Sequence, residues 1–190
     1  MKKVYIVLTH TGTMLSRAIK KYTKYEFSHV SISLDKELKE MYSFGRLKPY
    51  NPFIAGFIHE YINKGTFKRF YNTKARIYSL TITDEEYDNL QYNIRKINLE
   101  RENYKFNILG LFAAGVHKKI GKEKSFYCAE FVKYVLEQSK INVNLPEIVT
   151  PEDFNKLSQA EFVYEGLLRK YKVNKRKIIK DQVDNVLVAH

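Results

Sequence analysis

The hydrophobic residues of this chain recur with a period of two in some segments and with helical spacing in others, which predicts a mixture of strands and helices. The clearest alternation runs over Phe27–Leu34, whose polar side chains His29, Ser31 and Ser33 share one face. The shorter apolar run Val4–Leu8 predicts a buried strand that precedes it. These two strands, separated by a helical pattern, indicate an α+β protein.

Further strands and helices follow the same reasoning. After a charged turn, Leu38–Phe44 predicts an antiparallel partner for the alternating strand, and Arg76–Ile82 predicts another strand. Helical spacing over Thr13–Lys24 and Asn107–His117 predicts two helices. The sequence Thr83-Asp84-Glu85-Glu86 is a capping box, and it predicts a helix of about four turns after it.

One more helix is expected to begin near Ser125. Its apolar stripe consists of residues at helical spacing, namely Cys128, Phe131, Val132, Val135 and Leu136. This pattern places Cys128 in the first turn of the helix.

The remaining segments are predicted with less regular structure. Pro and Gly punctuate 46–74, which predicts a loop and a flap over a site. Thr150 and Pro151 begin a helix, and Phe162–Leu168 predicts a strand that leads to a basic segment from about residue 169. No linker divides the chain, so we expect a single domain over residues 1–190.

Composition narrows the possible partners. The chain has 190 residues and carries 33 Lys and Arg against 21 Asp and Glu, a formal charge of +12 that attracts anions. No apolar run approaches the roughly 20 residues that a bilayer requires, and no signal-peptide pattern is present. We therefore expect no transmembrane segment and a cytoplasmic protein.

The single cysteine, Cys128, excludes an internal disulfide framework and a cysteine-rich zinc site. Catalysis by a thiol requires the thiolate, which a helix N-terminus favours by only about 0.3–1 kcal/mol. A partner base is therefore needed. His29 is the histidine best placed by pattern, because it lies on the polar face of a strand beside small serines.

The sequence around these residues resembles a known family. The chain has Ser28-His29-Val30 in a predicted strand and, about a hundred residues later, Phe126-Tyr127-Cys128-Ala129-Glu130-Phe131 at a predicted helix start. This order is similar to that of the circularly permuted NlpC/P60 papain-like hydrolases of the YiiX/YaeF type. Ser16-Arg17-Ala18-Ile19 in a preceding helix also fits. The resemblance implies a permuted papain-like fold with an antiparallel sheet.

The resemblance also implies roles for individual residues. Cys128 would be the nucleophile and His29 the general base, and a polar residue on the next strand would orient the imidazole. Relatives commonly have an acidic residue there, whereas this chain has Tyr42, with Glu40 as the competitor. No metal or organic cofactor is implied.

Additional residues are candidates for contacts with the substrate or with an oxyanion. The backbone N–H of Cys128 is the expected oxyanion donor. Tyr127 would supply a wall or a hydroxyl, Thr11 would line the mouth of the site, and Ser31 lies beside His29. The His59-Glu60 pair resembles the start of a zincin motif, but Asn63 replaces the second histidine, so we interpret it as a solvated segment.

The predicted function is a cysteine peptidase or amidase that cleaves an amide or ester of a small molecule, peptide or lipid. Three alternatives remain open at this point. A lone cysteine on an apolar helix face is often inert packing. Permuted papain-like proteins also include lipid acyltransferases, which share the thioester intermediate. The basic clusters would also suit a noncatalytic protein that binds nucleic acid or an anionic surface, although no recognised nucleic-acid-binding module is present.

Overall fold

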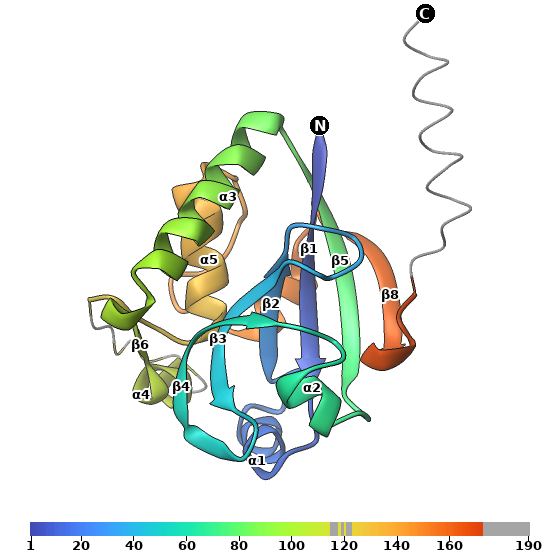
Figure 1. The fold of residues 1–190 in the computed structure, drawn as a ribbon, viewed down its shortest axis with the longest axis vertical. Helices are drawn as coiled ribbons and strands as arrows, with labels where there is room; N and C mark the ends of the chain where they lie inside the picture. The colour runs from blue at the N-terminus through green and yellow to red at the C-terminus, as the bar shows by residue number, and fades with distance from the viewer. Residues whose placement is uncertain (115–117, 119, 121–122, 173–190) are drawn as a thin grey trace, which may run out of the picture.

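The computed structural model describes residues 1–114, 118, 120 and 123–172. Its centre is a six-stranded antiparallel sheet with the strand order β4-β3-β2-β1-β5-β8 (Figure 1). The strands are β1 Lys2–His10, β2 His29–Ser33, β3 Met41–Lys48, β4 Asn51–Glu60, β5 Lys74–Ile82 and β8 Glu161–Leu167. A separate parallel pair joins β6 Lys105–Phe106 to β7 Ser125–Phe126. The expected α+β class is therefore confirmed.

The helices surround this sheet. They are α1 Met14–Thr23, α2 Gly65–Arg69, α3 Asp84–Leu99, α4 Ile108–Ala114 and α5 Cys128–Gln138, with short 3-10 turns at η1 Arg101–Asn103, η2 Pro151–Lys156 and η3 Leu168–Lys170. Helices α3 and α5 lie side by side along the sheet, and α1, α2 and α4 lie toward one end of it (Figure 1). No helix in the ranges given above is long and apolar enough to cross a bilayer.

The helix start that the capping box at Thr83 predicts is confirmed. Thr83 caps α3: its hydroxyl accepts from Glu86 N at 3.1 Å, and the Glu86 carboxylate accepts from Thr83 N at 2.7 Å. Such a cap stabilises a helix by about 1 kcal/mol. Thr13 similarly accepts from Ser16 N at the start of α1.

The main core lies between the sheet and helices α3 and α5. The aliphatic side chains of β1 and β2 that share a face, including Ile6, Val30 and Ile32, are fully buried there. Phe131 of α5 is also fully buried, and its ring centroid lies 5.3 Å from that of Phe44 on β3. Burying a side chain of this size contributes about 1.5–3 kcal/mol, so this contact fixes α5 across the strands.

The segment 46–74 differs from the predicted loop. Strand β3 continues to Lys48, a turn at Pro49 and Tyr50 follows, and β4 and α2 occupy most of the remainder. Strand β4 tolerates Pro52 and Gly56 because it is the edge strand of the sheet, where an unpaired N–H faces outward. The prediction that this segment is a loop was wrong, and the strand that it conceals contributes to the site.

The other boundaries shift by a few residues. The segment that begins at Pro151 forms a 3-10 turn, and the helix expected from Ser125 begins at Cys128. The predicted end of the helix at His117, and the basic segment beyond residue 172, lie outside the described residues.

Candidate active site

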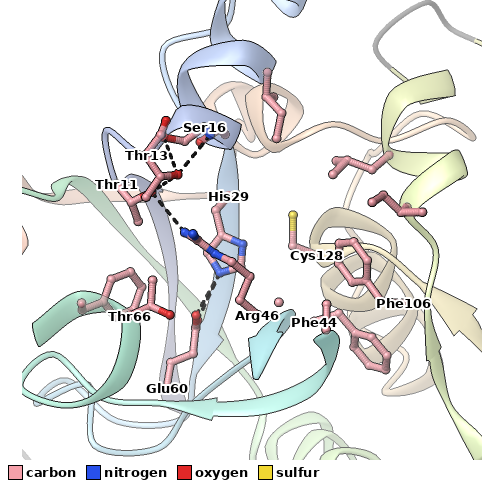
Figure 2. Close-up of a pocket in the computed structure, with 17 residues that line it drawn as sticks. Thr11, Thr13, Ser16, His29, Phe44, Arg46, Glu60, Thr66, Phe106 and Cys128 are labelled. Atoms are coloured by element: carbon pink, nitrogen blue, oxygen red, sulfur yellow. Dashed lines mark hydrogen bonds and ion pairs between the residues drawn. The ribbon is translucent and has the colours of Figure 1, made fainter. Parts of the chain in front are cut away.

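A pocket opens at the end of the sheet where β2 begins (Figure 2). In the register between β2 and β3, Ile32 pairs with Tyr42 and Ser33 pairs with Met41, and this pairing stops short of His29. The pocket has an empty volume of about 710 Å³, including its open mouth, and Cys128, His29 and Glu60 are among its lining residues.

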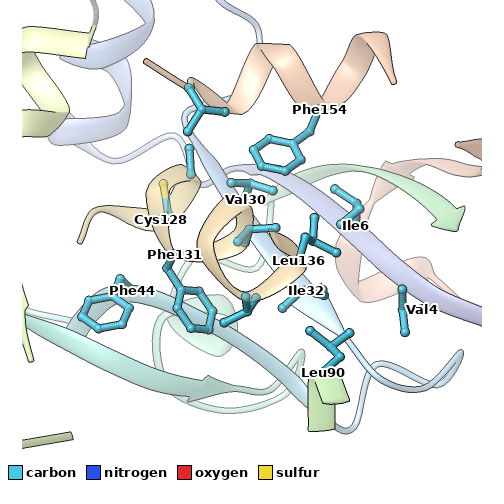
Figure 3. Packing of buried hydrophobic residues seen from close by; sticks show 14 of the residues in the cluster. Val4, Ile6, Val30, Ile32, Phe44, Leu90, Cys128, Phe131, Leu136 and Phe154 are labelled. Carbon is cyan, nitrogen blue, oxygen red and sulfur yellow. The ribbon is translucent and has the colours of Figure 1, made fainter. Parts of the chain in front are cut away.

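Cys128 is the first residue of α5, as the apolar stripe predicts. The Glu130 carboxylate accepts from the backbone N–H of Tyr127 at 3.1 Å, which fixes the first turn. The residue is only 3% exposed, yet it lines the pocket, and Figure 3 shows its side chain at the end of α5, beyond the packed row that includes Phe131. The thiol is thus surrounded by core residues on the helix side and faces the pocket on the other.

His29 is the first residue of β2, and its side chain is 19% exposed. Its Nε2 lies 3.1 Å from Glu60 Oε1 and 3.2 Å from Glu60 Oε2, so the ring N–H donates to this carboxylate. Figure 2 shows the sulfur of Cys128 on the opposite side of the ring from Glu60. The imidazole therefore lies between a carboxylate at Nε2 and a thiol on the side of Nδ1.

The charge state of His29 follows from these neighbours. Burial by itself lowers the pKa of the imidazole, but the charge of Glu60, together with hydrogen bonding and charge interactions with Cys128 and Glu60, outweighs it and raises the pKa to about 10. At neutral pH the ring is an imidazolium. An imidazolium beside a thiol is an environment typical of reactive cysteines.

Glu60 is 8% exposed in its side chain and is the last residue of β4. Figure 1 shows this end of β4 crossing in front of β3 and β2, and hydrogen bonds to His29 and Ser31 place the Glu60 carboxylate over the polar face of β2. Ser31 on that face donates its hydroxyl to Glu60 Oε2 at 2.5 Å. The interpretation of His59-Glu60 as a solvated segment was wrong, because Glu60 is a buried partner of the histidine.

Tyr42 does not occupy the place expected for the orienting residue. It pairs with Ile32 near the far end of β2, and its ring stacks on those of His59 and Phe57, with centroid distances of 4.6 and 5.9 Å. Glu40 lies just before β3, and its backbone N–H donates to the Asp35 carboxylate. The acidic residue that contacts the Nε2 atom of His29 is Glu60.

The other candidates take different positions. Thr11 lines the pocket, as expected for the mouth of the site. Tyr127 is 2% exposed and donates its hydroxyl to the Val149 carbonyl at 2.7 Å, which directs it away from a substrate. Ser31 is fully buried and binds Glu60, so it supports the carboxylate.

Two residues of the pocket were missed by sequence reasoning. Gly45 on β3 leaves room for the imidazole, since a Cβ there would lie 3.3 Å from His29 Cε1. Arg46 places a half-buried guanidinium beside the ring (Figure 2), and burial lowers the pKa of this group, opposed by the charge of Glu60. Only their place directly after the predicted strand Leu38–Phe44 pointed toward the site.

The donor set does not favour a metal. In the part of the chain that the structure describes, no three His, Cys, Asp or Glu side chains gather in a way that could hold a metal ion.

No family model matches this chain, and no curated protein matches it.

Proposed function

We propose that this protein is a thiol hydrolase in which Cys128, His29 and Glu60 act together on an amide or ester. The observation that carries the proposal is the placement of the imidazole between Glu60 and Cys128 inside a pocket. A carboxylate that orients a histidine, which in turn faces a nucleophile, is the arrangement that activates thiols and hydroxyls in hydrolases.

The chemistry follows from the three groups. The proton given up by the Cys128 thiol is the one that the His29 imidazolium holds, stabilised by Glu60, so the sulfur reacts as a thiolate beside a cation. The thiolate attacks the substrate carbonyl carbon, and the oxyanion that forms accepts from the N–H of Cys128, which has no partner within the helix because it belongs to the first turn. His29 then protonates the leaving group, and a thioester remains on Cys128.

The second half of the reaction uses the same histidine. Once His29 has given up its proton, the neutral ring takes a proton from water, and the hydroxide equivalent attacks the thioester carbonyl. The acid leaves, and the sulfur returns to its starting state. The fold that we propose for this chemistry is a permuted papain-like one, supported by a histidine strand that precedes a cysteine helix packed on an antiparallel sheet.

An activated ester tests the mechanism directly. Incubation with p-nitrophenyl acetate should release a burst of p-nitrophenol equivalent to the protein and place an acetyl group on Cys128, located by peptide mass spectrometry. Cys128→Ala and His29→Gln should abolish the burst, whereas His59→Gln, a histidine that does not line the pocket, should keep it. Acetylation confined to other residues, or an undiminished burst in His29→Gln, would contradict the proposal.

A second candidate is acyl transfer on lipids, favoured by the exposed apolar side chains of α4. Leu109 and Phe112 are 59% and 41% exposed, next to Ile108 and Leu111, which line the pocket. Exposed apolar side chains beside a pocket are typical of membrane or partner contacts. If this candidate is correct, activity on an acyl lipid requires vesicles, and Leu109→Ser lowers it without affecting the acetate burst.

A further inference from the structure

The pocket holds a cation that the hydrolytic mechanism does not use. Arg46 has five N–H donors. Within the described residues, these donors make one long hydrogen bond, from Nη2 to Thr11 Oγ1 at 3.5 Å. The guanidinium carbon also lies 5.4 Å from the centroid of the Phe70 ring. Most of the hydrogen-bonding capacity of this side chain therefore faces the pocket.

The neighbouring acid does not satisfy this cation. Glu60 binds His29 and Ser31, and the ion pairs of the described residues include none between Glu60 and Arg46. Burying a charge is costly unless an opposite charge and hydrogen bonds compensate for it. A ligand that brings its own anion into the pocket would supply both.

We propose that the substrate carries a carboxylate close to its reacting carbonyl, and that Arg46 with the hydroxyl of Thr11 binds it. This inference rests on the proposed function of Cys128. A carboxylate matches the guanidinium fork through two parallel hydrogen bonds. The one free cation in the described pocket lining suits a monoanion, since a phosphate dianion would place an uncompensated charge near Glu60. Figure 2 shows the guanidinium beside the His29 ring, so the bound carboxylate lies near the scissile bond.

Two alkylating reagents of nearly equal size test this assignment, because the chain has one cysteine. Iodoacetate carries a carboxylate next to the carbon that sulfur attacks, and iodoacetamide is its neutral counterpart. We expect the ratio of their rates on Cys128 at pH 7 to exceed that of glutathione by roughly tenfold or more, since a charged hydrogen bond contributes that much. Arg46→Gln should lower the ratio by a similar factor, and Arg46→Lys should retain part of it.

The control is Arg69→Gln, which removes an exposed cation that stacks on Tyr50, with a distance of 3.9 Å to the ring centroid. Its ratio should equal that of the wild type. If iodoacetate has no advantage, or if Arg46→Gln leaves the advantage unchanged, the carboxylate assignment is overturned while the thiol mechanism stands. If Cys128 reacts with both reagents no faster than glutathione does, the proposed function itself is overturned.

Discussion

Replacing Glu60 with Gln removes one charge from the site and little else. The amide oxygen, in the place of Oε2, still accepts from His29 Nε2 and from the Ser31 hydroxyl, which lie 3.2 and 2.5 Å from that carboxylate oxygen. The shape of the buried side chain is retained. Any change in the ionisation of His29 therefore reports the charge of Glu60 rather than a collapse of the pocket.

The expected magnitude follows from the distance. Two unit charges separated by about 3 to 4 Å interact by about 4 to 5.5 kcal/mol at an effective dielectric constant of 20, which corresponds to about three to four pKa units. Solvent at the partly exposed ring reduces this figure. We expect the pKa of His29 to fall by at least about two units in Glu60→Gln, from the wild-type value of about 10.

Titration by NMR measures this directly. The chain has five histidines, and the His29 imidazole signals are assigned by their loss in His29→Gln. Glu161→Gln is the matched control, because Glu161 is an exposed acid that binds Lys3. A wild-type midpoint below pH 7, or a midpoint that Glu60→Gln leaves near 10, would refute the assignment of Glu60 as the partner that stabilises the imidazolium.

Three further predictions concern the same end of the sheet. Gly45→Ala places a Cβ 3.3 Å from His29 Cε1 and displaces the ring, so the rate of the acetate burst should fall roughly tenfold to a hundredfold. The control is Gly56→Ala on the paired strand, where the new Cβ makes only an ordinary contact, and its burst rate should match that of the wild type. Equal rates for the two alanine variants would refute this role. Thr9 Oγ1 is buried without a hydrogen-bond partner among the described residues, so Thr9→Val should raise the free energy of unfolding in urea by about 1–2 kcal/mol, and a decrease would contradict the reasoning. The pKa of His29 is raised in the folded state, so its stabilising contribution is complete below the ordinary value of 6.5 and is lost as the pH rises toward 10. In urea unfolding, the free energy of unfolding of the wild type minus that of His29→Gln should fall by up to about 5 kcal/mol between pH 6 and pH 10. A difference that grows with pH would contradict the raised pKa of His29.

The local elements were predictable because their signals lie within a few residues. The alternation around His29 defines a strand, and the stripe that begins at Cys128 defines a helix. The capping box at Thr83 needs only four residues to be recognised. In each case side-chain spacing and hydrogen bonding to the adjacent backbone determine the structure.

The third member of the site was not predictable by the same means. Glu60 is 31 residues from His29, and the strand that carries it contains Pro52 and Gly56, which favour a loop when they are read locally. Pairing with β3 overrides that preference, as tertiary context commonly does for strands. The crossing of β4 over β2, which brings the carboxylate to the imidazole, depends on the curvature of the sheet and leaves no periodic signal.

The pairing of sulfur and imidazole is tested most directly by the reactivity of the single thiol at mildly acidic pH. The rate of alkylation by iodoacetamide at pH 6, followed by intact mass, should be at least about tenfold higher for the wild type than for His29→Gln, because the imidazolium stabilises the reactive thiolate. His59→Gln should match the wild type. Equal rates for the wild type and His29→Gln would contradict the account, since Cys128 would then react without help from the histidine.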